Sequence, residues 1–376
     1  MRHFTRIALL VLTSQLGHGT ADAQDSLVSV FWENDMRFFR GCPEPGDRAI
    51  DPRTLQPIES CEHSDRYYTN GIKVTVSWRY GGRVGLPDFL RLSRRGYLWQ
   101  RGFSFGQNLY TPDNIVTTEF QPNDRPYGAW LYVGFQGKAI NTTNQHLIEV
   151  QVGCTGKCSR GRDVQTFIHR NFGAPTPGGW DYQIEDGLGW LFMYERQKKS
   201  VRVESLFPDV ENAPGLDVSL RGRGMAGNVF TSATAGATVR LGWGLQQEFD
   251  PGDGPGTYPA MPGTSTAVPR RYTSEELAEA IKNQRSQATL YFFGQALGTA
   301  VRHNVFVTAA PSRVTLEPLV RTLEWGVAGS LRLPLGFLVP GRSTRIQLVW
   351  RNVWRSREFD QQPRRHQFGS FHFLVG

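Results

Sequence analysis

Apolar and polar residues alternate with a period of two along most of this chain. Ile72, Val74 and Val76 are apolar, and Lys73 and Thr75 separate them. Such alternation predicts a β-strand with one apolar and one polar face. The pattern recurs at 131–136, 148–152 and 345–351, and further candidates lie near 27–33, 97–110, 190–201, 215–227, 229–243, 288–302, 320–333 and 371–375. These segments amount to about twelve strands, an even number that is typical of bacterial outer-membrane barrels.

The strand pattern fits two architectures, a soluble β-sandwich and a membrane barrel. One strand face is polar or charged throughout, which favours the barrel, since its interior is wet. We therefore predict an all-β fold, a closed antiparallel transmembrane β-barrel of about 12 strands with both termini on the periplasmic side. The aromatic residues near strand ends are expected to form girdles at the membrane interfaces. These are Trp32, Tyr80, Trp99, Tyr110, Trp130, Trp190, Trp243 and Trp350.

The N-terminus is typical of a secretory signal peptide. Arg2 and Arg6 precede the apolar segment 7–12, and Ala21-Asp22-Ala23 matches a cleavage site. We predict a signal peptide over 1–23 and a mature outer-membrane β-barrel domain over 24–376. A buried N-terminal helix is the alternative. Export and a transmembrane barrel together predict a place in the outer membrane of a Gram-negative bacterium.

The amino-acid composition narrows the possible classes of protein further. The 376 residues include 41 Gly, 22 Pro and 12% aromatic residues, which excludes a coiled coil or a helical solenoid. The net charge is +8, and removing two Arg and one Asp with the signal peptide lowers it to +7. No nucleic-acid-binding motif accompanies this charge. The positive net charge is explained equally well by attraction to anionic lipid or polysaccharide and by charged loop residues that keep the protein soluble.

Four cysteines in an exported chain favour disulfides. Cys42 and Cys61 bracket a Pro-rich segment, and Cys154 and Cys158 are close enough to close a tight loop. The pairing is not fixed by the sequence. A zinc site made of Cys154, Cys158 and His169 is the alternative, but it lacks a fourth ligand.

Long connections are expected at 33–67, 111–126, 154–189 and 244–287, and a capping box at Thr273–Glu276 predicts a short helix to about Asn283. Asn34 and Asp35 end the first strand, and Thr69 lies at the start of the second, so consecutive antiparallel strands bring them to one rim. Strand parity predicts that Asp35 and Thr69 both face into the barrel. Their hard oxygen atoms suit Ca²⁺. The alternative is a set of rim residues that only hydrogen-bond the loop ends.

The third connection contains a helix over 162–170. Val164, Phe167 and Ile168 share an apolar stripe, while Gln165 and His169 are i, i+4 neighbours on an adjoining face. A histidine can act as a general base near neutral pH. The alternative is an ordinary surface histidine.

Seven short motifs occur in order along the mature chain. They are Glu33-Asn34-Asp35, Asp65-Arg66-Tyr67-Tyr68-Thr69-Asn70-Gly71, Gly106-Gln107-Asn108-Leu109-Tyr110-Thr111-Pro112, Asp124-Arg125-Pro126-Tyr127, Val164-Gln165-Thr166-Phe167-Ile168-His169-Arg170, Gly179-Trp180-Asp181-Tyr182-Gln183 and Arg357-Glu358-Phe359. Together they resemble the outer-membrane lipid A 3′-O-deacylase family.

The resemblance implies a twelve-stranded barrel that is a Ca²⁺-dependent esterase acting on lipid A. His169 would be the base, Gln165 its catalytic neighbour, and Asn34, Asp35 and Thr69 the metal site. The active site would face the outer leaflet. We also expect loop arginines such as Arg125 to bind lipid A phosphates, and we expect a monomer. The insertion at 41–64, a missing family lysine and the terminal Gly376 depart from the family pattern. A non-catalytic barrel, either a channel or a structural protein, is the alternative function.

Overall fold

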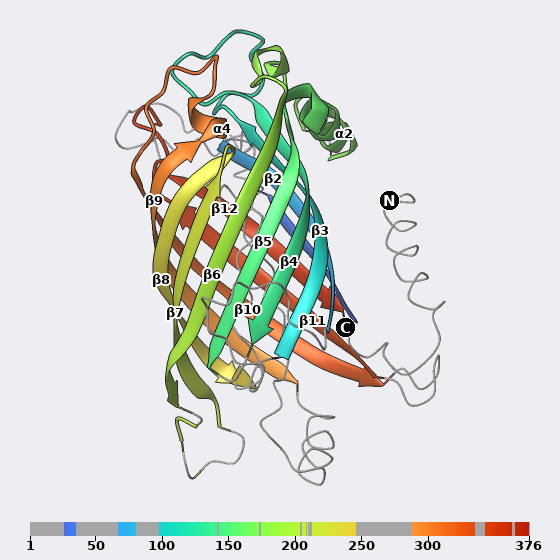
Figure 1. The fold of residues 1–376 in the computed structure, drawn as a ribbon, viewed down its shortest axis with the longest axis vertical. Coiled ribbons are helices and arrows are strands. Elements are labelled where there is room, and N and C mark those ends of the chain that lie inside the picture. Colours follow the sequence, from blue (N-terminus) through green and yellow to red (C-terminus); the bar gives the residue numbers. More distant parts are fainter. Residues whose placement is uncertain are drawn as a thin grey trace, which may run out of the picture.

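The computed structural model describes residues 26–34, 67–79, 98–140, 143–172, 174–203, 205–207, 209, 213–245, 288–334, 343–362 and 365–375. In these ranges twelve antiparallel strands form one closed barrel (Figure 1). The strands are β1 (Ser26–Asn34), β2 (Tyr67–Arg79), β3 (Leu98–Thr111), β4 (Gly128–Ile140), β5 (Asn144–Thr155), β6 (Gly187–Val203), β7 (Gly215–Gly227), β8 (Phe230–Trp243), β9 (Thr289–Asn304), β10 (Leu319–Pro334), β11 (Ser343–Arg355) and β12 (His366–Val375). The predicted fold class is confirmed.

The barrel closes where the first strand meets the last. β1 pairs with β12 from Val28 opposite Val375 to Asn34 opposite Gly369. Every strand therefore has two neighbours, which satisfies the backbone groups that hydrocarbon cannot solvate. The start of β1 and the end of β12 lie at the same end of the barrel, as an even strand number requires. The described parts of the connections contain four short helices, namely η3 (Gly156–Ser159), α2 (Gly161–Phe172), η4 (Trp180–Tyr182) and α4 (Val305–Thr308). Among the described helices, none has the length and apolar character needed to cross a membrane.

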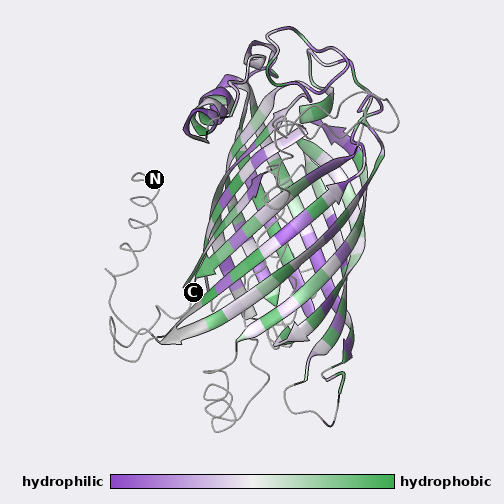
Figure 2. Cartoon of the chain, turned by 180° about the vertical axis from the view of Figure 1, so that it is seen from behind, coloured by the Kyte–Doolittle hydropathy of each residue, from purple (hydrophilic) through white to green (hydrophobic). Residues whose placement is uncertain are grey.

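Strand parity separates a polar interior from an apolar outer wall. On β2 the side chains of Lys73, Thr75 and Ser77 are buried inside the barrel, as predicted. Outward residues such as Phe103, Phe105, Val133 and Val152 are roughly half exposed in the isolated chain. Green apolar positions therefore alternate with polar ones along the strands (Figure 2). An apolar outer wall of this kind suits contact with lipid.

Charged side chains in the interior of the barrel are paired with one another. Lys73 Nζ lies 3.0 Å from Glu149 Oε2, and Arg351 Nη1 lies 3.1 Å from Glu324 Oε2. Arg240 Nε donates to Asp217 Oδ1 at 2.8 Å. Because an unpaired buried charge is costly, these pairs make the polar interior tolerable. The Lys73–Glu149 pair joins β2 to β5, whereas the other two pairs join neighbouring strands.

Aromatic side chains fill the end of the barrel at which α2 and α4 lie, here called the loop end (Figure 1). Helix α4 carries Phe306, whose ring stacks on Tyr110 at 4.3 Å between centroids. Tyr68, Tyr110 and Trp130 belong to the same buried cluster. Tyr110 and Trp130 are therefore not girdle residues, because their positions on β3 and β4 point inward. Trp190 and Trp243 are about half exposed on the outer wall, as a girdle requires.

Several predictions fall outside the described residues. They concern the signal peptide over 1–23, Tyr80, the Cys42–Cys61 pair with its 41–64 insertion, the helix at 273–283 and the position of Asp35.

Candidate active site

The connection between β5 and β6 folds against the outside of the barrel. It contains η3, α2 and η4, and α2 lies beside the outer wall rather than across the barrel mouth (Figure 1). Cys154 at the end of β5 is bonded to Cys158 in η3. This disulfide excludes the zinc alternative, since neither sulfur is available as a thiolate.

Helix α2 turns a polar face toward the barrel. Gly161, Gln165 and His169, spaced four residues apart, are all buried, whereas Phe167 is 59% exposed. A Cβ on Gly161 would lie 2.5 Å from the ring of Trp180 and 2.7 Å from Cβ of Ala129. The helix therefore approaches the wall so closely that only glycine fits at this position.

The outward side chains of β3 and β4 form the floor beneath this helix. Leu109 and Ala129 pack in one buried cluster with Ile115, Tyr127 and Trp180. Gln107 Nε2 donates to the carbonyl oxygen of Ser159 in η3 at 2.6 Å. On the same outward row of β3, Phe103 and Phe105 are exposed. The helical connection thus covers the wall just beyond the band of exposed apolar residues.

A hydrogen bond fixes the amide of Gln165. Trp180 Nε1 donates to Gln165 Oε1 at 2.7 Å. An indole N–H only donates, so the oxygen of the amide must face Trp180 and Nε2 must face away from it. Gln165 Nε2 is buried and has no hydrogen-bond partner among the described residues. The amide therefore keeps one buried donor that no described residue uses.

His169 lies one turn further along the same buried face. It is 3% exposed, so its imidazole does not point into bulk solvent. Its Nδ1 contacts the carbonyl oxygen of Pro175. Because a carbonyl only accepts, this contact assigns the proton of the neutral ring to Nδ1 and makes Nε2 the basic nitrogen.

Asn34 and Thr69 come together at the rim of β1 and β2. Asn34 Nδ2 donates to the carbonyl oxygen of Thr69 at 3.2 Å. The hydroxyls of Thr69 and Thr111 lie 2.6 Å apart. The register of β2 against β3 shifts between Tyr68 and Asn70. Thr69 is the residue at this bulge, and bulges re-aim side chains.

The predicted inward orientation of Thr69 is wrong, because the bulge turns its side chain outward. Its hydroxyl meets Thr111, which shares the outward row of β3 with Gln107 and Leu109. Leu109 in turn packs in the cluster that contains Trp180, the partner of Gln165. The rim pair and the buried face of α2 therefore belong to one outer wall, and the candidate site lies outside the lumen. Thr111 contacts the rim pair, and Trp180 contacts the buried face of α2. No role was predicted for either residue, although both lie in motifs that carry the family resemblance.

Arg125 does not have the predicted phosphate-binding position. It is fully buried, and its Nε and Nη2 donate to the carbonyl oxygen of Phe306 at 3.1 and 2.9 Å. Its Nη1 lies 3.2 Å from Glu358 Oε2, and the guanidinium stacks over Tyr110. These contacts use its charge to hold α4 in the barrel mouth, so we assign it a structural role.

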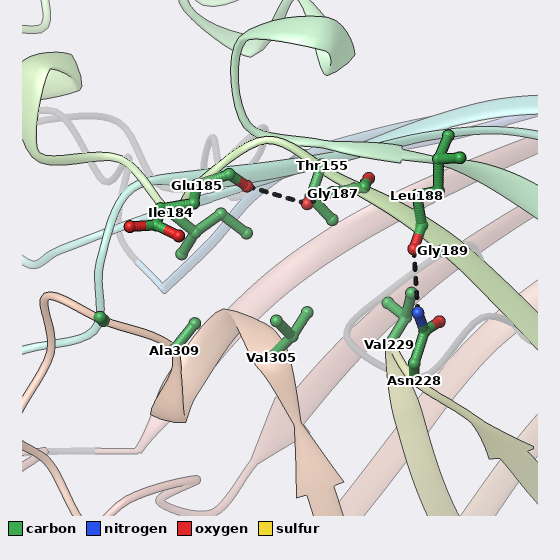
Figure 3. A pocket seen from close by; sticks show the side chains of 11 residues that line it. Thr155, Ile184, Glu185, Gly187, Leu188, Gly189, Asn228, Val229, Val305 and Ala309 are labelled. Atoms are coloured by element: carbon green, nitrogen blue, oxygen red, sulfur yellow. Dashed lines mark hydrogen bonds between the residues drawn. The ribbon is translucent and has the colours of Figure 1, made fainter.

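A separate pocket of about 220 Å³ opens at the loop end (Figure 3). It lies between the start of β6, the turn before β8 and α4. Thr155 Oγ1 donates to the carbonyl oxygen of Glu185 at 3.1 Å, and Asn228 Nδ2 donates to that of Leu188 at 2.9 Å. Neither Gln165 nor His169 lines this pocket, so it is distinct from the candidate site.

A closed barrel with an apolar outer wall and a helix packed against its loop end belongs to the class of outer-membrane β-barrels. The family model described as outer membrane protein LpxR matches residues 59–376, and the chain belongs to this family. The predicted family resemblance is thereby confirmed, and with it the assignment to outer-membrane proteins.

One of the matching solved structures supports the fold. LpxR from Salmonella typhimurium matches with a TM-score of 0.59 and 17% identity, over 93% of this chain and 99% of that one. The β domain of the Bordetella autotransporter BrkA (9% identity, 93% and 97% covered) and the translocator domain of NalP from Neisseria meningitidis (8% identity, 100% and 94% covered) have TM-scores of only 0.40 and 0.38. No curated protein is similar enough in sequence to be matched.

Proposed function

We propose that this protein is an esterase that removes an ester-linked acyl chain from lipid A, as a 3′-O-deacylase does. The observation that carries the proposal is the pair formed by Gln165 and His169, buried one helical turn apart between α2 and the outer wall. Membership of the LpxR family supports it. A site on the outer wall also favours a lipid substrate, since such a substrate reaches it from the membrane.

In the proposed reaction His169 accepts a proton from water at Nε2, and the water oxygen attacks the ester carbonyl carbon. The carbonyl oxygen of Pro175 holds Nδ1–H and so fixes the ring during this transfer. When the ester C–O bond breaks, the proton on Nε2 passes to the leaving alkoxide oxygen of the lipid, which becomes a hydroxyl. The products are a free fatty acid and the deacylated lipid. General-base catalysis of this kind contributes roughly 10²–10⁴-fold to a rate.

Gln165 Nε2 supplies a neutral hydrogen-bond donor beside the base. Its amide cannot turn without losing the hydrogen bond from Trp180. The donor is therefore held ready for the attacking water or for the ester carbonyl oxygen. Removal of a single preorganised donor at a developing oxyanion costs about 10²–10³ in kcat in other enzymes.

The residues at the rim fit a calcium ion. Asn34 and Thr69 offer amide, hydroxyl and carbonyl oxygens, and Asp35 would add a carboxylate. Within the described ranges, which do not include Asp35, no group of three or more His, Cys, Asp and Glu is placed to hold a metal. When bound, Ca²⁺ would polarise the ester carbonyl. We place this site toward the outer leaflet and propose that the protein acts as a monomer.

Mass spectrometry of lipid A from cells with and without the protein tests the function. We expect loss of one ester-linked acyl chain, and His169→Ala should abolish that loss while the barrel still forms. His303→Ala is the matched control, because the imidazole of His303 also contacts a backbone carbonyl, that of Asn228, but on β9 away from α2. Chelation of Ca²⁺ should mimic His169→Ala. Deacylation by the His169→Ala variant at the unmutated rate would contradict the proposal.

A non-catalytic barrel is the competing function, and its channel form needs an open polar interior. In the described part of the chain, the Lys73–Glu149 pair joins β2 to β5 inside the lumen, and the aromatic cluster around Phe306 fills its loop end. These features argue against a channel. Unchanged lipid A in the experiment above, with the barrel folded, would favour the structural form.

A further inference from the structure

Trp180 joins the helix, the barrel wall and the polar pair. It is 1% exposed and lies in η4, outside the helix that bears Gln165 and His169. Its ring fills the space against Gly161 at the start of α2, where a Cβ would meet it at 2.5 Å. It also packs against the ring of Tyr127 in a tilted arrangement, with 5.1 Å between the ring centroids. One rigid side chain thus sets the distance of α2 from the wall.

The same indole also sets the orientation of Gln165. The hydrogen bond from Trp180 Nε1 joins residues fifteen positions apart in the chain. Without it, the amide oxygen and nitrogen of Gln165 could exchange places, and half of the orientations would present an acceptor beneath α2 in place of a donor.

We propose that Trp180 is a positioning residue, which fixes the Gln165 amide so that Nε2 faces the reacting ester. This inference rests on the proposed esterase function. Trp180 would not touch the substrate and would act only through Gln165. It therefore differs from a residue that merely stabilises the fold.

The test is a double-mutant cycle of Trp180→Phe and Gln165→Met, assayed for fatty-acid release from lipid A. Phe keeps most of the ring packing and removes only the N–H. We expect Trp180→Phe to lower kcat about fivefold with KM little changed, which corresponds to the loss of a hydrogen bond worth about 1 kcal/mol. In the Gln165→Met background Trp180→Phe should lower kcat no further.

The matched control is Trp130→Phe. Trp130 Nε1 donates to Gln151 Oε1 at 3.2 Å, an equivalent pair on β4 and β5 inside the barrel. That variant should keep the unmutated kcat. The inference is overturned if Trp180→Phe leaves kcat unchanged, or lowers it equally in both backgrounds.

A second measurement does not depend on activity. In protein labelled with ¹⁵N-glutamine, the side-chain amide signal of Gln165, assigned by its loss in Gln165→Met, should be single in the unmutated chain. It should broaden or double in Trp180→Phe. A single, unshifted signal in Trp180→Phe would overturn the positioning role. If the unmutated protein releases no fatty acid while this signal behaves as expected, the proposed esterase function fails and the positioning of Gln165 by Trp180 stands.

Discussion

The chain contains two buried tryptophan–glutamine pairs, one inside the barrel and one beneath α2. Trp130 donates to Gln151 and Trp180 donates to Gln165, and in each case Nε2 of the glutamine lacks a partner among the described residues. An unpartnered buried amide therefore does not by itself mark a functional site. In the barrel interior such groups line a polar lumen, where water can reach them.

The two pairs differ in their neighbourhood. Near Gln151, Glu149 is held by Lys73 and Ser104, so the nearby charge is already neutralised. Gln165 instead shares its helix face with His169, whose basic nitrogen is set by Pro175. The comparison indicates that a buried amide donor can take part in catalysis where a general base lies one helical turn away. Interior residues should accordingly affect stability, and residues beneath α2 should affect turnover.

The largest expected effect concerns the barrel mouth. Arg125→Gln should lower the free energy of unfolding by about 3–5 kcal/mol, because it leaves Glu358 buried without its partner. Urea unfolding in detergent measures this change. Arg162→Gln is the control, since the ion pair of Arg162 with Asp181 is exposed and should contribute at most about 1 kcal/mol. Equal effects of the two substitutions would refute the structural role of Arg125.

The sharpest test of the comparison replaces each glutamine. Gln165→Ala should lower kcat for fatty-acid release by about 100-fold, because it removes the preorganised donor beside His169. Gln151→Ala should leave kcat within about twofold, although it removes the same kind of amide and the same indole hydrogen bond. Similar losses in both variants would show that the distinction between the two regions is wrong.

A substitution at Gly161 tests whether the close spacing between α2 and the barrel wall matters for activity. Gly161→Ala places a methyl group against Trp180 and Ala129, neither of which can move aside easily. We expect kcat to fall about tenfold as α2 shifts, a loss equivalent to about 1.4 kcal/mol. Gly222→Ala on β7 is the control, because nothing lies within 4 Å of its added Cβ. Full activity of Gly161→Ala would mean that the spacing of α2 is not critical.

The smallest expected effect is a pH dependence in the connection 111–126. Burial raises the pKa of the Asp124 carboxyl to about 6, although the backbone N–H groups of Asp113 and Arg125 act in the opposite direction. The folded loop therefore binds the proton more tightly than the open loop. Its stability should decrease as pH rises from about 4 to about 6 and then stay level. Hydrogen exchange of this loop, corrected for intrinsic rates, measures the trend, and Asp124→Asn should abolish it.

The sequence predicted the barrel well because alternation is a local signal. On β2, each of Lys73, Thr75 and Ser77 faces inward as its parity requires, and no distant contact is needed to place it. The i, i+4 spacing likewise predicted that Gln165 and His169 share a face. Local periodicity does not tell which face of α2 is buried, since that depends on the wall of β3 and β4.

The missed features depend on contacts between distant segments. The bulge at Thr69 shifts its hydroxyl to Thr111, and parity assumes a regular strand. Arg125 resembles a loop cation in the sequence, yet its partner Glu358 lies 233 positions away. The role of Trp180 follows only once η4 is folded back on α2. Such pairings have no signature in a single sequence.

The position of α2 outside the barrel has a consequence for how kinetics should be measured. A lipid reaching this wall would arrive by lateral diffusion within one leaflet, and it would not pass through bulk water. The relevant concentration is then a surface density, the mole fraction of substrate in the bilayer or micelle. Diluting the substrate with inert detergent at fixed bulk concentration should slow turnover, whereas adding buffer at fixed mole fraction should not.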